Sequence, residues 1–457
     1  MVPAGQRATV ARRARVRAGG SRAPPVVSAD ARALGARARG SARPSTRVKR
    51  AHLWLIAFAA IAPRLAVLVH ERGRILTAFT DKSDDFAQTF VHHGTFGFIP
   101  GEPSAYTQPL YGFFLVPIYW IFGRTWWAVG GAQVAVATAT AILVYAIGAR
   151  VLSRRAGTIA AILATLNPYL VWHDVHLNRE VLDQLVGVAL ILCTLIAADR
   201  RSVRWATAAG ILGGVAVLGN VRLIGIPLVV AAYLVIRNGW SWAPVALVAA
   251  AALAVTPWVV RNKVEVGCFA LTTDGRALWK ANNAQTYGLL AQGKWIDDVK
   301  DPPHHPFPNP EEARDLYRQT GKKYHVDECA NQGYYEHKAW KFVRGHPGEK
   351  AKLAAQAVRM EWDPRTTASA TDSGHGAIRS LAQPLYTSVL YALGLIGIVV
   401  TARWFAGLAL AVLAYQTLAA MVFVGATRYR IATDFLIALL AAGAIEWVLA
   451  RWRRRPR

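Results

Sequence analysis

Three aspartates follow the first long apolar stretch of the chain. Asp81, Asp84 and Asp85 precede residues 86–91, in which apolar side chains recur at the spacing of an amphipathic helix. The N-terminus of a helix favours anionic side chains, so such a helix would hold the carboxylates at a fixed depth beside the apolar stretch. A carboxylate in that position can stay solvated, bind a cation or act as a general base.

Basic side chains at or near the ends of other apolar stretches complement these carboxylates. Ionisable groups at membrane depth are costly, which makes them candidates for function. The planar donor fork of arginine suits the oxygens of a phosphate group. The candidate basic residues are Arg64, Arg222, Arg261, Lys280, Arg428 and Arg430. Acids and arginines that converge at a lipid–water boundary predict a lipid substrate that carries a phosphate.

Histidines do not extend this pattern into a metal site. His173 and His176 have the spacing of a ligand pair, but no further ligand has a fixed relation to them. Ion pairing explains the other charges of their loop, residues 173–180. His304 and His305 fall in a proline-rich loop and are interpreted as surface residues. The sequence therefore predicts no bound metal.

The composition indicates which elements position these residues. Of the 457 residues, 54% are hydrophobic and 18% are charged, whereas soluble proteins carry about 25% charged residues. Ten apolar runs approach the length needed to cross the ~30 Å hydrocarbon core of a bilayer. They are residues 52–70, 126–148, 157–172, 181–198, 205–220, 223–236, 241–260, 385–402, 404–424 and 431–450. We expect an all-α polytopic membrane protein with about ten transmembrane helices, in which Gly210, Gly213 and Gly214 permit close helix packing.

The apolar run 109–122 is interpreted as a juxtamembrane helix. It is short for a span, contains two prolines and is rich in aromatic residues, like interfacial helices. With this choice, the arginine-bearing loops fall on the cytoplasmic side together with both termini, as the positive-inside rule requires. These loops are residues 150–155, 199–204, 237–240 and 401–403. The polar stretches 71–125 and 261–380 then share the extracytoplasmic face and can build one site.

The N-terminal segment has a composition of its own. Residues 1–50 carry thirteen arginine or lysine residues, one acid and almost no large apolar side chains. Such a segment cannot bury enough surface to fold, so we expect a disordered, basic cytoplasmic tail. Its composition also fits a transit peptide, a nucleic-acid-binding segment or an upstream start-codon artefact.

Cysteine is scarce, and three residues make no disulfide framework. Cys193 lies in an apolar run and is expected to pack there. Cys268 and Cys329 lie in the long polar loop and can pair if that loop faces an oxidising compartment.

Four motifs resemble those of the GT-C superfamily, the multispanning glycosyltransferases that use polyprenyl-phosphate sugars. The chain is similar to bacterial relatives of protein O-mannosyltransferases and aminoarabinose transferases over about residues 50–450. The motifs are Asp81-Lys-Ser-Asp84-Asp85-Phe86 with Gly94-Thr-Phe96, Gln108-Pro109-Leu-Tyr111, Pro257-Trp258-Val-Val-Arg261-Asn262 with Leu278-Trp279-Lys280-Ala281-Asn282-Asn283, and Arg428-Tyr429-Arg430. Gln108, Ala281 and Asp434 depart from the family pattern, which usually has Pro, Gly and Pro there.

The resemblance implies inverting transfer of a sugar from a polyprenyl-phosphate carrier to an extracytoplasmic hydroxyl of a protein, lipid or glycan. A first-loop carboxylate takes the proton of the acceptor, and cations stabilise the departing phosphate. Asp84 and Asp85 are the first candidates for this base, and Asp81 is the third. The residues expected to bind substrate are Glu180, Arg261, Lys280, Asn282, Arg428, Arg430, Arg64, Arg222 and Tyr111. No cofactor is expected besides the donor, and the expected partners are membrane lipids, donor and acceptor, with no nucleic acid.

These expectations divide the chain into a tail (1–50), an N-terminal transmembrane module (51–260) with a catalytic first loop (71–125), an extracytoplasmic cap (261–380), and a C-terminal module with a basic cytoplasmic tail (381–457). The cap is a mixed loop region in which residues 311–320 and 335–361 are expected to be helical. The expected location is the inner or plasma membrane of a bacterium, with the active site outside.

Two other classes of protein stay open. In a transporter or flippase, Arg64 and the carboxylates would line a translocation path. Such proteins usually show internal repeats, and the sequence shows none. A non-catalytic scaffold gives no reason for acids and arginines to gather on one face.

Overall fold

The computed structural model describes residues 46–78, 81–365 and 377–453. The features described below lie in the unit Ala51–Arg457, apart from residues 46–50. Most of the predicted basic tail lies outside the described residues, as do residues 454–457. Residues 46–50, which were expected to belong to the tail, instead begin helix α2 (Thr46–His70).

Eight segments of the described chain are helical, long and apolar enough to cross a membrane. They are α2, α5 (Trp126–Val151), α8 (Glu180–Arg200), α10 (Ile226–Asn238) with the 3-10 turn Val221–Leu223, α11 (Trp242–Glu265), α17 (Ala377–Val400), α18 (Arg403–Val422), and α20 (Asp434–Arg453) with α19 (Thr427–Arg430) and the 3-10 turn Ile431–Thr433. The predicted all-α polytopic class is confirmed, whereas the predicted number of about ten spans is not.

Two of the predicted spans form shorter helices. Residues 157–172 are divided between α6 (Arg154–Thr165) and α7 (Pro168–His173). The break follows from Asn167, whose side chain caps α7, and from the proline after it, which is suited to the first position of a helix. Residues 205–220 form α9 (Val203–Gly219), which is 17 residues long.

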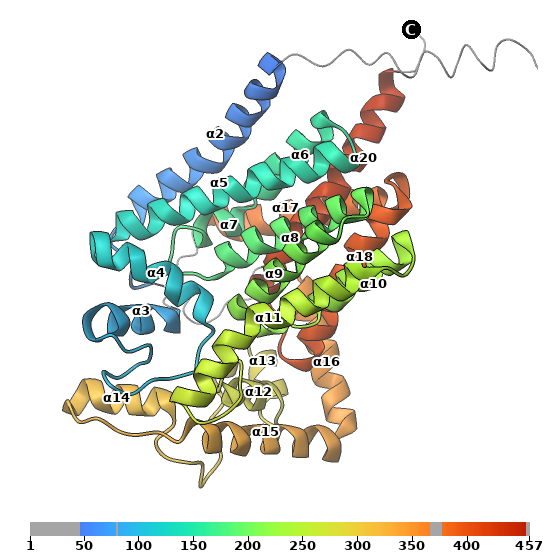
Figure 1. Cartoon of the computed structure of the whole chain (residues 1–457). Helices are drawn as coiled ribbons and strands as arrows, with labels where there is room; N and C mark the ends of the chain where they lie inside the picture. Colours follow the sequence, from blue (N-terminus) through green and yellow to red (C-terminus); the bar gives the residue numbers. More distant parts are fainter. Residues whose placement is uncertain (1–45, 79–80, 366–376, 454–457) are drawn as a thin grey trace, which may run out of the picture. The chain divides into compact units, whose positions relative to one another are not determined.

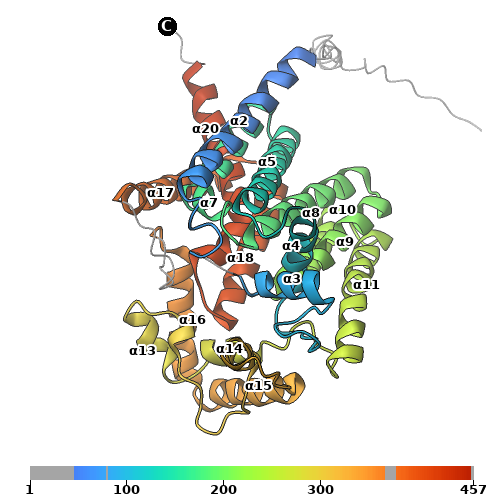
Figure 2. The ribbon, with the colours of Figure 1, turned by 90° about the vertical axis from the view of Figure 1, so that its left-hand side faces the viewer.

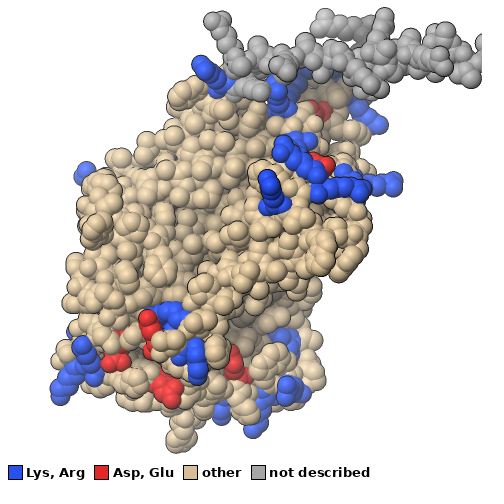
Figure 3. All heavy atoms as spheres, in the orientation of Figure 1, with Lys and Arg blue, Asp and Glu red and all other residues tan. Residues whose placement is uncertain are grey.

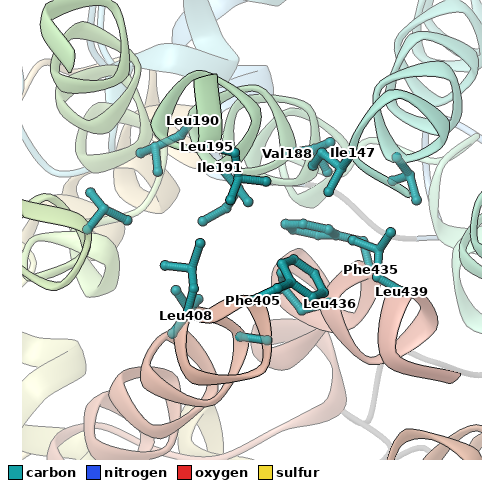
Figure 4. Close-up of a cluster of buried hydrophobic side chains, with 14 of the residues drawn as sticks. Ile147, Val188, Leu190, Ile191, Leu195, Phe405, Leu408, Phe435, Leu436 and Leu439 are labelled. Carbon is teal, nitrogen blue, oxygen red and sulfur yellow. The ribbon is translucent and has the colours of Figure 1, made fainter. Parts of the chain in front are cut away.

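Helix α8 packs against α5, α9 and α10 (Figure 1). Figure 4 shows apolar side chains from α5, α8, α18 and α20 that meet in one cluster, among them Ile147, Ile191, Phe405 and Leu436. Each of these four is at most 2% exposed. Close packing of this kind, rather than exclusion of water, holds helices together in lipid.

Glycines permit the close contact between α9 and α11. A Cβ at Gly210 would lie 2.1 Å from the backbone oxygen of Leu247, and one at Gly214 would lie 2.6 Å from that of Ala251. Gly213 is less restricted, because its Cβ would lie 3.0 Å from the side chain of Pro227 in α10. The prediction that these three glycines permit close packing is confirmed.

We expect Gly210→Ala to lower the stability of the folded protein by about 1–3 kcal/mol, the usual cost of overpacking a core. The added methyl group would meet a backbone carbonyl that cannot move without displacing α11. Gly407→Ala in α18 is the matched control, because a Cβ there has no atom within 4 Å. Thermal unfolding in detergent measures both variants, and equal melting temperatures for the two would contradict this account.

The first loop contains two short helices. α3 (Lys82–His93) begins at its N-cap Asp81 and ends at Gly94, whose φ of 70° suits glycine. Its first turn carries two aspartates, as the sequence predicts. α4 (Pro109–Phe122) has the bounds of the predicted juxtamembrane helix; its position relative to a membrane stays a prediction.

The cap consists of short helices joined by irregular segments. They are α12 (Gly275–Ala281), α13 (Thr286–Ala291), the 3-10 turn Ile296–Asp298, α14 (Pro310–Thr320), α15 (Glu328–Gly345) and α16 (Pro347–Trp362). α14 confirms the helix predicted at 311–320. The helix predicted at 335–361 is broken at His346, because the following proline begins α16. Figures 1 and 2 both show the cap at the end of the bundle that carries α3.

A disulfide joins the start of the cap to α15. Cys268 and Cys329 are bonded, with their Cα atoms 5.9 Å apart. The pairing that the sequence left conditional is thus present in the structure. Cys193 is unpaired in α8 and partly buried.

Charged side chains lie at two levels of the molecule. Figure 3 shows lysine and arginine with few acids near one end of the face in view, acids and bases together at the other, and a broad uncharged band between. The loops at the first end expose Arg155, Arg200, Arg204, Arg237 and Arg403. This distribution agrees with the topology predicted from the arginine-bearing loops.

Candidate active site

A polar cavity of about 340 Å³ lies where the first loop and the cap meet the ends of α8, α10 and α18. Its charged lining residues are Asp81, Lys82, Arg179, Arg222, Asp274, Asp297 and Arg428. Three of them, Asp81, Arg222 and Arg428, were predicted as site residues. Segments from the first loop to the last span therefore converge on one cavity.

Asp81 is the first-loop aspartate that lines this cavity. As the N-cap of α3, it accepts a hydrogen bond from the backbone nitrogen of Ser83 through Oδ1 at 3.0 Å. This bond fixes the side chain at the start of the helix and leaves Oδ2 outside it. A second cavity of about 520 Å³, between α3 and α14, is also lined by Asp81. Asp81 thus borders both cavities.

Arg222 is a cavity cation for which the described residues provide no carboxylate ion pair. Its guanidinium lies 3.5 Å from the centre of the Tyr429 ring, and Nη1 donates to the backbone oxygen of Val424 at 2.7 Å. Stacking of this kind holds a guanidinium in place while some of its donors stay available. Arg222 is therefore suited to bind an anion in the cavity.

Arg428 and Arg179 add positive charge beside Arg222. Arg428 pairs with Glu180, with its Nη2 2.8 Å from Oε1. Arg179 donates from Nη1 to Gln108 at 2.5 Å, and its buried Nε has no partner among the described residues. Burial lowers the pKa of Arg179, but attraction by Asp81 and Glu180 more than offsets this and raises it. Arg179, Arg222 and Arg428 thus place three positive charges in the cavity that Asp81 also lines.

Lys82 lines the same cavity but is held by acids of the cap. Its Nζ lies 3.0 Å from Glu311 Oε1 and 3.4 Å from Asp274 Oδ2. It also lies 4.5 Å from the centre of the Tyr106 ring. Lys82 thus joins the start of α3 to the cap.

The two aspartates predicted first as the base lie elsewhere on α3. Asp84 is 4% exposed and accepts hydrogen bonds from Tyr119 at 2.5 Å and from Arg124 Nη2 at 2.8 Å. Asp85 contacts Arg318 of α14 at 2.6 Å. Burial raises the pKa of the Asp85 carboxyl, although attraction by Arg318 lowers it. Neither side chain lines the 340 Å³ cavity.

Three predicted binding residues hold the loops around the cavity together. Arg261 donates to the backbone oxygens of Ser104 and Phe96 in the first loop and pairs with Glu265. Lys280 is 5% exposed and donates to the backbone oxygen of Asp297, and its burial lowers its pKa. The structure does not place either side chain in the cavity lining.

Asn282 has a comparable role. Its Nδ2 donates to the backbone oxygens of Leu278 and Val422, and its Oδ1 accepts from Lys350 at 2.5 Å. These bonds join the cap to the end of α18.

The remaining predicted residues are buried inside the bundle. Arg430 is fully buried and pairs with Asp434 at 2.9 Å. Arg64 is 1% exposed and pairs with Asp174 at 2.7 Å. Tyr111 donates to Gln133 at 2.6 Å. The structure does not bring these three to the cavity.

Four charged cavity residues were absent from the predicted site. Lys82 directly follows Asp81, and Arg179 belongs to the polar loop 173–180, so both lay within stretches that the sequence marks. Asp274 precedes α12 and Asp297 lies in the 3-10 turn Ile296–Asp298, and no sequence pattern distinguishes either from a solvated acid.

Known proteins resemble the chain in sequence and in fold. Residues 103–268 match the family described as dolichyl-phosphate-mannose-protein mannosyltransferase. No curated protein matches the chain in sequence.

Solved structures resemble it at low sequence identity. The archaeal oligosaccharyltransferase AglB from Archaeoglobus fulgidus, in complex with an inhibitory peptide and a dolichol-phosphate, has a TM-score of 0.52 at 14% identity, and the match covers 89% of this chain and 51% of that one. The same enzyme tethered with an acceptor peptide has a TM-score of 0.53 at 13% identity, with 89% and 50% covered. ArnT from Cupriavidus metallidurans, bound to undecaprenyl phosphate, has a TM-score of 0.42 at 14% identity, with 86% and 77% covered.

The chain spans about half the length of the archaeal oligosaccharyltransferase that it matches. The structural match shows that the chain shares the fold of that oligosaccharyltransferase, and residues 103–268 resemble the mannosyltransferase family.

Proposed function

We propose that the protein is an inverting glycosyltransferase that moves a sugar from a polyprenyl-phosphate carrier to an extracytoplasmic hydroxyl group. The observation that carries this proposal is the cavity that Arg222, Arg428 and Arg179 line together with Asp81. Arginines supply donors for a phosphate, and an aspartate supplies a base. The family match and the phosphate-bearing lipid in the related archaeal complex support the same substrate class.

In the proposed reaction, the acceptor oxygen attacks the anomeric carbon from the side opposite the phosphate. A new carbon–oxygen bond forms, the bond from the anomeric carbon to the phosphate oxygen breaks, and the configuration inverts. Asp81 takes the hydroxyl proton, while the lipid phosphate leaves with the bonding electrons. The nearby arginines stabilise the negative charge that grows on that phosphate. They supply the positive charge that the step requires, so we propose no cofactor besides the donor.

The two cavities suggest separate paths for the two substrates. The 340 Å³ cavity contains the arginines and suits the lipid phosphate. The 520 Å³ cavity between α3 and α14 suits the acceptor, because it also reaches Asp81. The acceptor hydroxyl can belong to a protein, a lipid or a glycan.

The proposal places the site on the extracytoplasmic face of a bacterial plasma membrane. The Cys268–Cys329 disulfide supports this side for the cap, because disulfides persist in oxidising compartments. The exposed arginines of the opposite loops support a cytoplasmic location for those loops.

A transfer assay tests the proposed function. Purified protein would be incubated with radiolabelled polyprenyl-phosphate sugars and candidate acceptors. The label on the acceptor, and the labelled free sugar released by transfer to water, would be counted. Transfer with release of polyprenyl phosphate is expected. Movement of the intact donor across proteoliposomes, with no sugar transfer, would instead indicate a flippase.

The topology gives a separate prediction. In a Cys193→Ser background, a membrane-impermeant maleimide should label Lys294→Cys of the cap in intact cells, because the cap is expected to lie outside. Arg204→Cys should be labelled only after the cells are permeabilised. Both positions are exposed, so labelling by the maleimide reports the side of the membrane on which each residue lies and not its burial in the protein. The reverse pattern would contradict the proposed orientation.

We expect Arg222→Gln to weaken binding of a polyprenyl phosphate roughly 10- to 100-fold, because hydrogen bonds to charged groups contribute about 1.5–3 kcal/mol. Stability should change less, because Arg222 has no ion pair with any described residue that the variant would lose. Arg204→Gln removes an exposed arginine from the opposite face and is the matched control. Lipid-binding titrations measure both variants, and unchanged affinity in Arg222→Gln would exclude it from the phosphate site.

A further inference from the structure

We propose that cap helix α14 holds α3, and with it Asp81, in the position needed for catalysis, and that Arg318 and Glu311 are positioning residues for the base. This inference rests on the proposed function of Asp81. It explains the ion pairs between α3 and α14, which take no part in the chemical step, as a restraint on the position of α3.

Two groups of ion pairs join α3 to α14. At the start of α3, Lys82 meets Glu311 at 3.0 Å. One helical turn later, Asp85 meets Arg318 at 2.6 Å and Arg314 at 3.7 Å. Residues three or four apart share a helix face, so the two groups connect one face of α3 with one face of α14.

Charge order fixes the register of this contact. α3 presents a base and then an acid, whereas α14 presents an acid and then two bases. A shift of one helix along the other would bring Lys82 towards Arg314 or Asp85 towards Glu311, and both encounters repel. The observed pairing is therefore the register in which all five charges are matched.

The contact is anchored deeper in the cap at one end. Glu311 also bonds to Arg276, which forms a two-bond pair with Asp301, and Tyr335 donates to Asp301 at 2.9 Å. Burial raises the pKa of Glu311, but Lys82 and Arg276 lower it to about 2. Glu311 therefore stays charged near neutral pH, and a rigid part of the cap supports the first turn of α3.

The consequence concerns Asp81, the residue directly before Lys82. Its carboxylate is oriented by the first turn of α3 through Ser83. A displacement of about 1 Å of a catalytic group can cost roughly 100-fold in rate. An unrestrained α3 would thus slow the chemistry while the arginines of α19 and the Val221–Leu223 turn still bound the donor.

Charge reversal in the pair of Asp85 and Arg318 tests this proposal without altering the cavity that contains Arg222. The variants are Arg318→Glu, Asp85→Arg and the double swap Asp85→Arg/Arg318→Glu, with Gln319→Glu as the matched control. Gln319 is exposed, lies beside Arg318 on α14 and is not part of the contact. Hydrogen–deuterium exchange of the amides of residues 82–93 reports the restraint, and kcat and donor affinity report its effect on catalysis.

Each single reversal should speed amide exchange in α3 and lower kcat roughly tenfold, with donor affinity within about twofold of wild type. The double swap should restore slow exchange and most of kcat, because it rebuilds an ion pair of opposite sense. Exchange in α3 as slow as in the Gln319→Glu control, in both single variants, would overturn the proposal. The exchange measurement decides this even if no donor supports transfer, so it is separate from the test of the proposed function.

Discussion

Asp81→Asn is expected to lower sugar transfer roughly 10²- to 10⁴-fold, the usual effect of removing a general base. The variant should fold normally, because asparagine caps a helix as well as aspartate does and can keep the bond to Ser83. Donor binding should persist, since Arg222 and Arg428 are unchanged. Initial rates at saturating donor and acceptor, together with a lipid-binding titration, measure the two properties separately.

Asp84→Asn and Asp85→Asn are the matched controls for this experiment. Asp84→Asn should lower the stability of the protein more than its kcat, because the Asp84 carboxylate accepts hydrogen bonds from the buried Tyr119 hydroxyl and from Arg124. Asp85→Asn weakens two partly exposed pairs, with Arg318 and Arg314, each usually worth below about 1 kcal/mol, and should lower kcat less than Asp81→Asn does. A tenfold or greater loss of kcat in a well-folded Asp84 or Asp85 variant, with Asp81→Asn near wild type, would return the role of base to the residue first predicted.

The sequence located the aspartates of the proposed site but could not rank them. All three lie within one turn of the start of a helix, and the spacing between acid and aromatic does not distinguish them. Their partners, Ser83, Tyr119, Arg124 and Arg318, decide the matter. Three of these four are far from α3 in the chain, so their contacts arise only from the tertiary fold.

Hydrophobic periodicity and capping predicted much of the architecture. The all-α membrane class and α4 followed from apolar runs and prolines, and the start of α3 followed from its aspartates. The number of spans did not, because a cap such as Asn167 ends one helix and begins another within a continuous apolar run. Local hydrogen bonds of this kind change helix boundaries without changing composition.

The roles of the arginines could not be predicted from the sequence either. The sequence marked Arg222, Arg428 and Arg430 alike, as costly charges at the membrane edge. The structure separates them by their partners: Arg222 stacks on Tyr429 in the cavity, whereas Arg430 is enclosed with Asp434. The charge of an arginine and its depth predict that it has a role. The residues around it determine whether that role is to bind a ligand or to stabilise the fold.

Arg430→Gln is accordingly expected to destabilise the protein by about 3–5 kcal/mol, the cost of leaving one partner of a buried ion pair unpaired. Asp434 is only 4% exposed, so water cannot take the place of the guanidinium. The guanidinium also donates to the backbone oxygen of Glu361, which joins α16 to the last span. Thermal unfolding and the yield of monodisperse protein in detergent measure the loss.

The double variant Arg430→Gln/Asp434→Asn separates folding from phosphate binding. It removes both charges and leaves two neutral groups that can bond to each other, so it should recover part of the lost stability. Any protein that folds should bind polyprenyl phosphate with near wild-type affinity, in contrast to Arg222→Gln. Normal stability of Arg430→Gln combined with lost lipid binding would show instead that Arg430 contacts the phosphate, as the sequence predicted. The argument depends on the enclosed geometry of the pair, because the same two charges at the cavity surface would be hydrated and would contribute little to the fold.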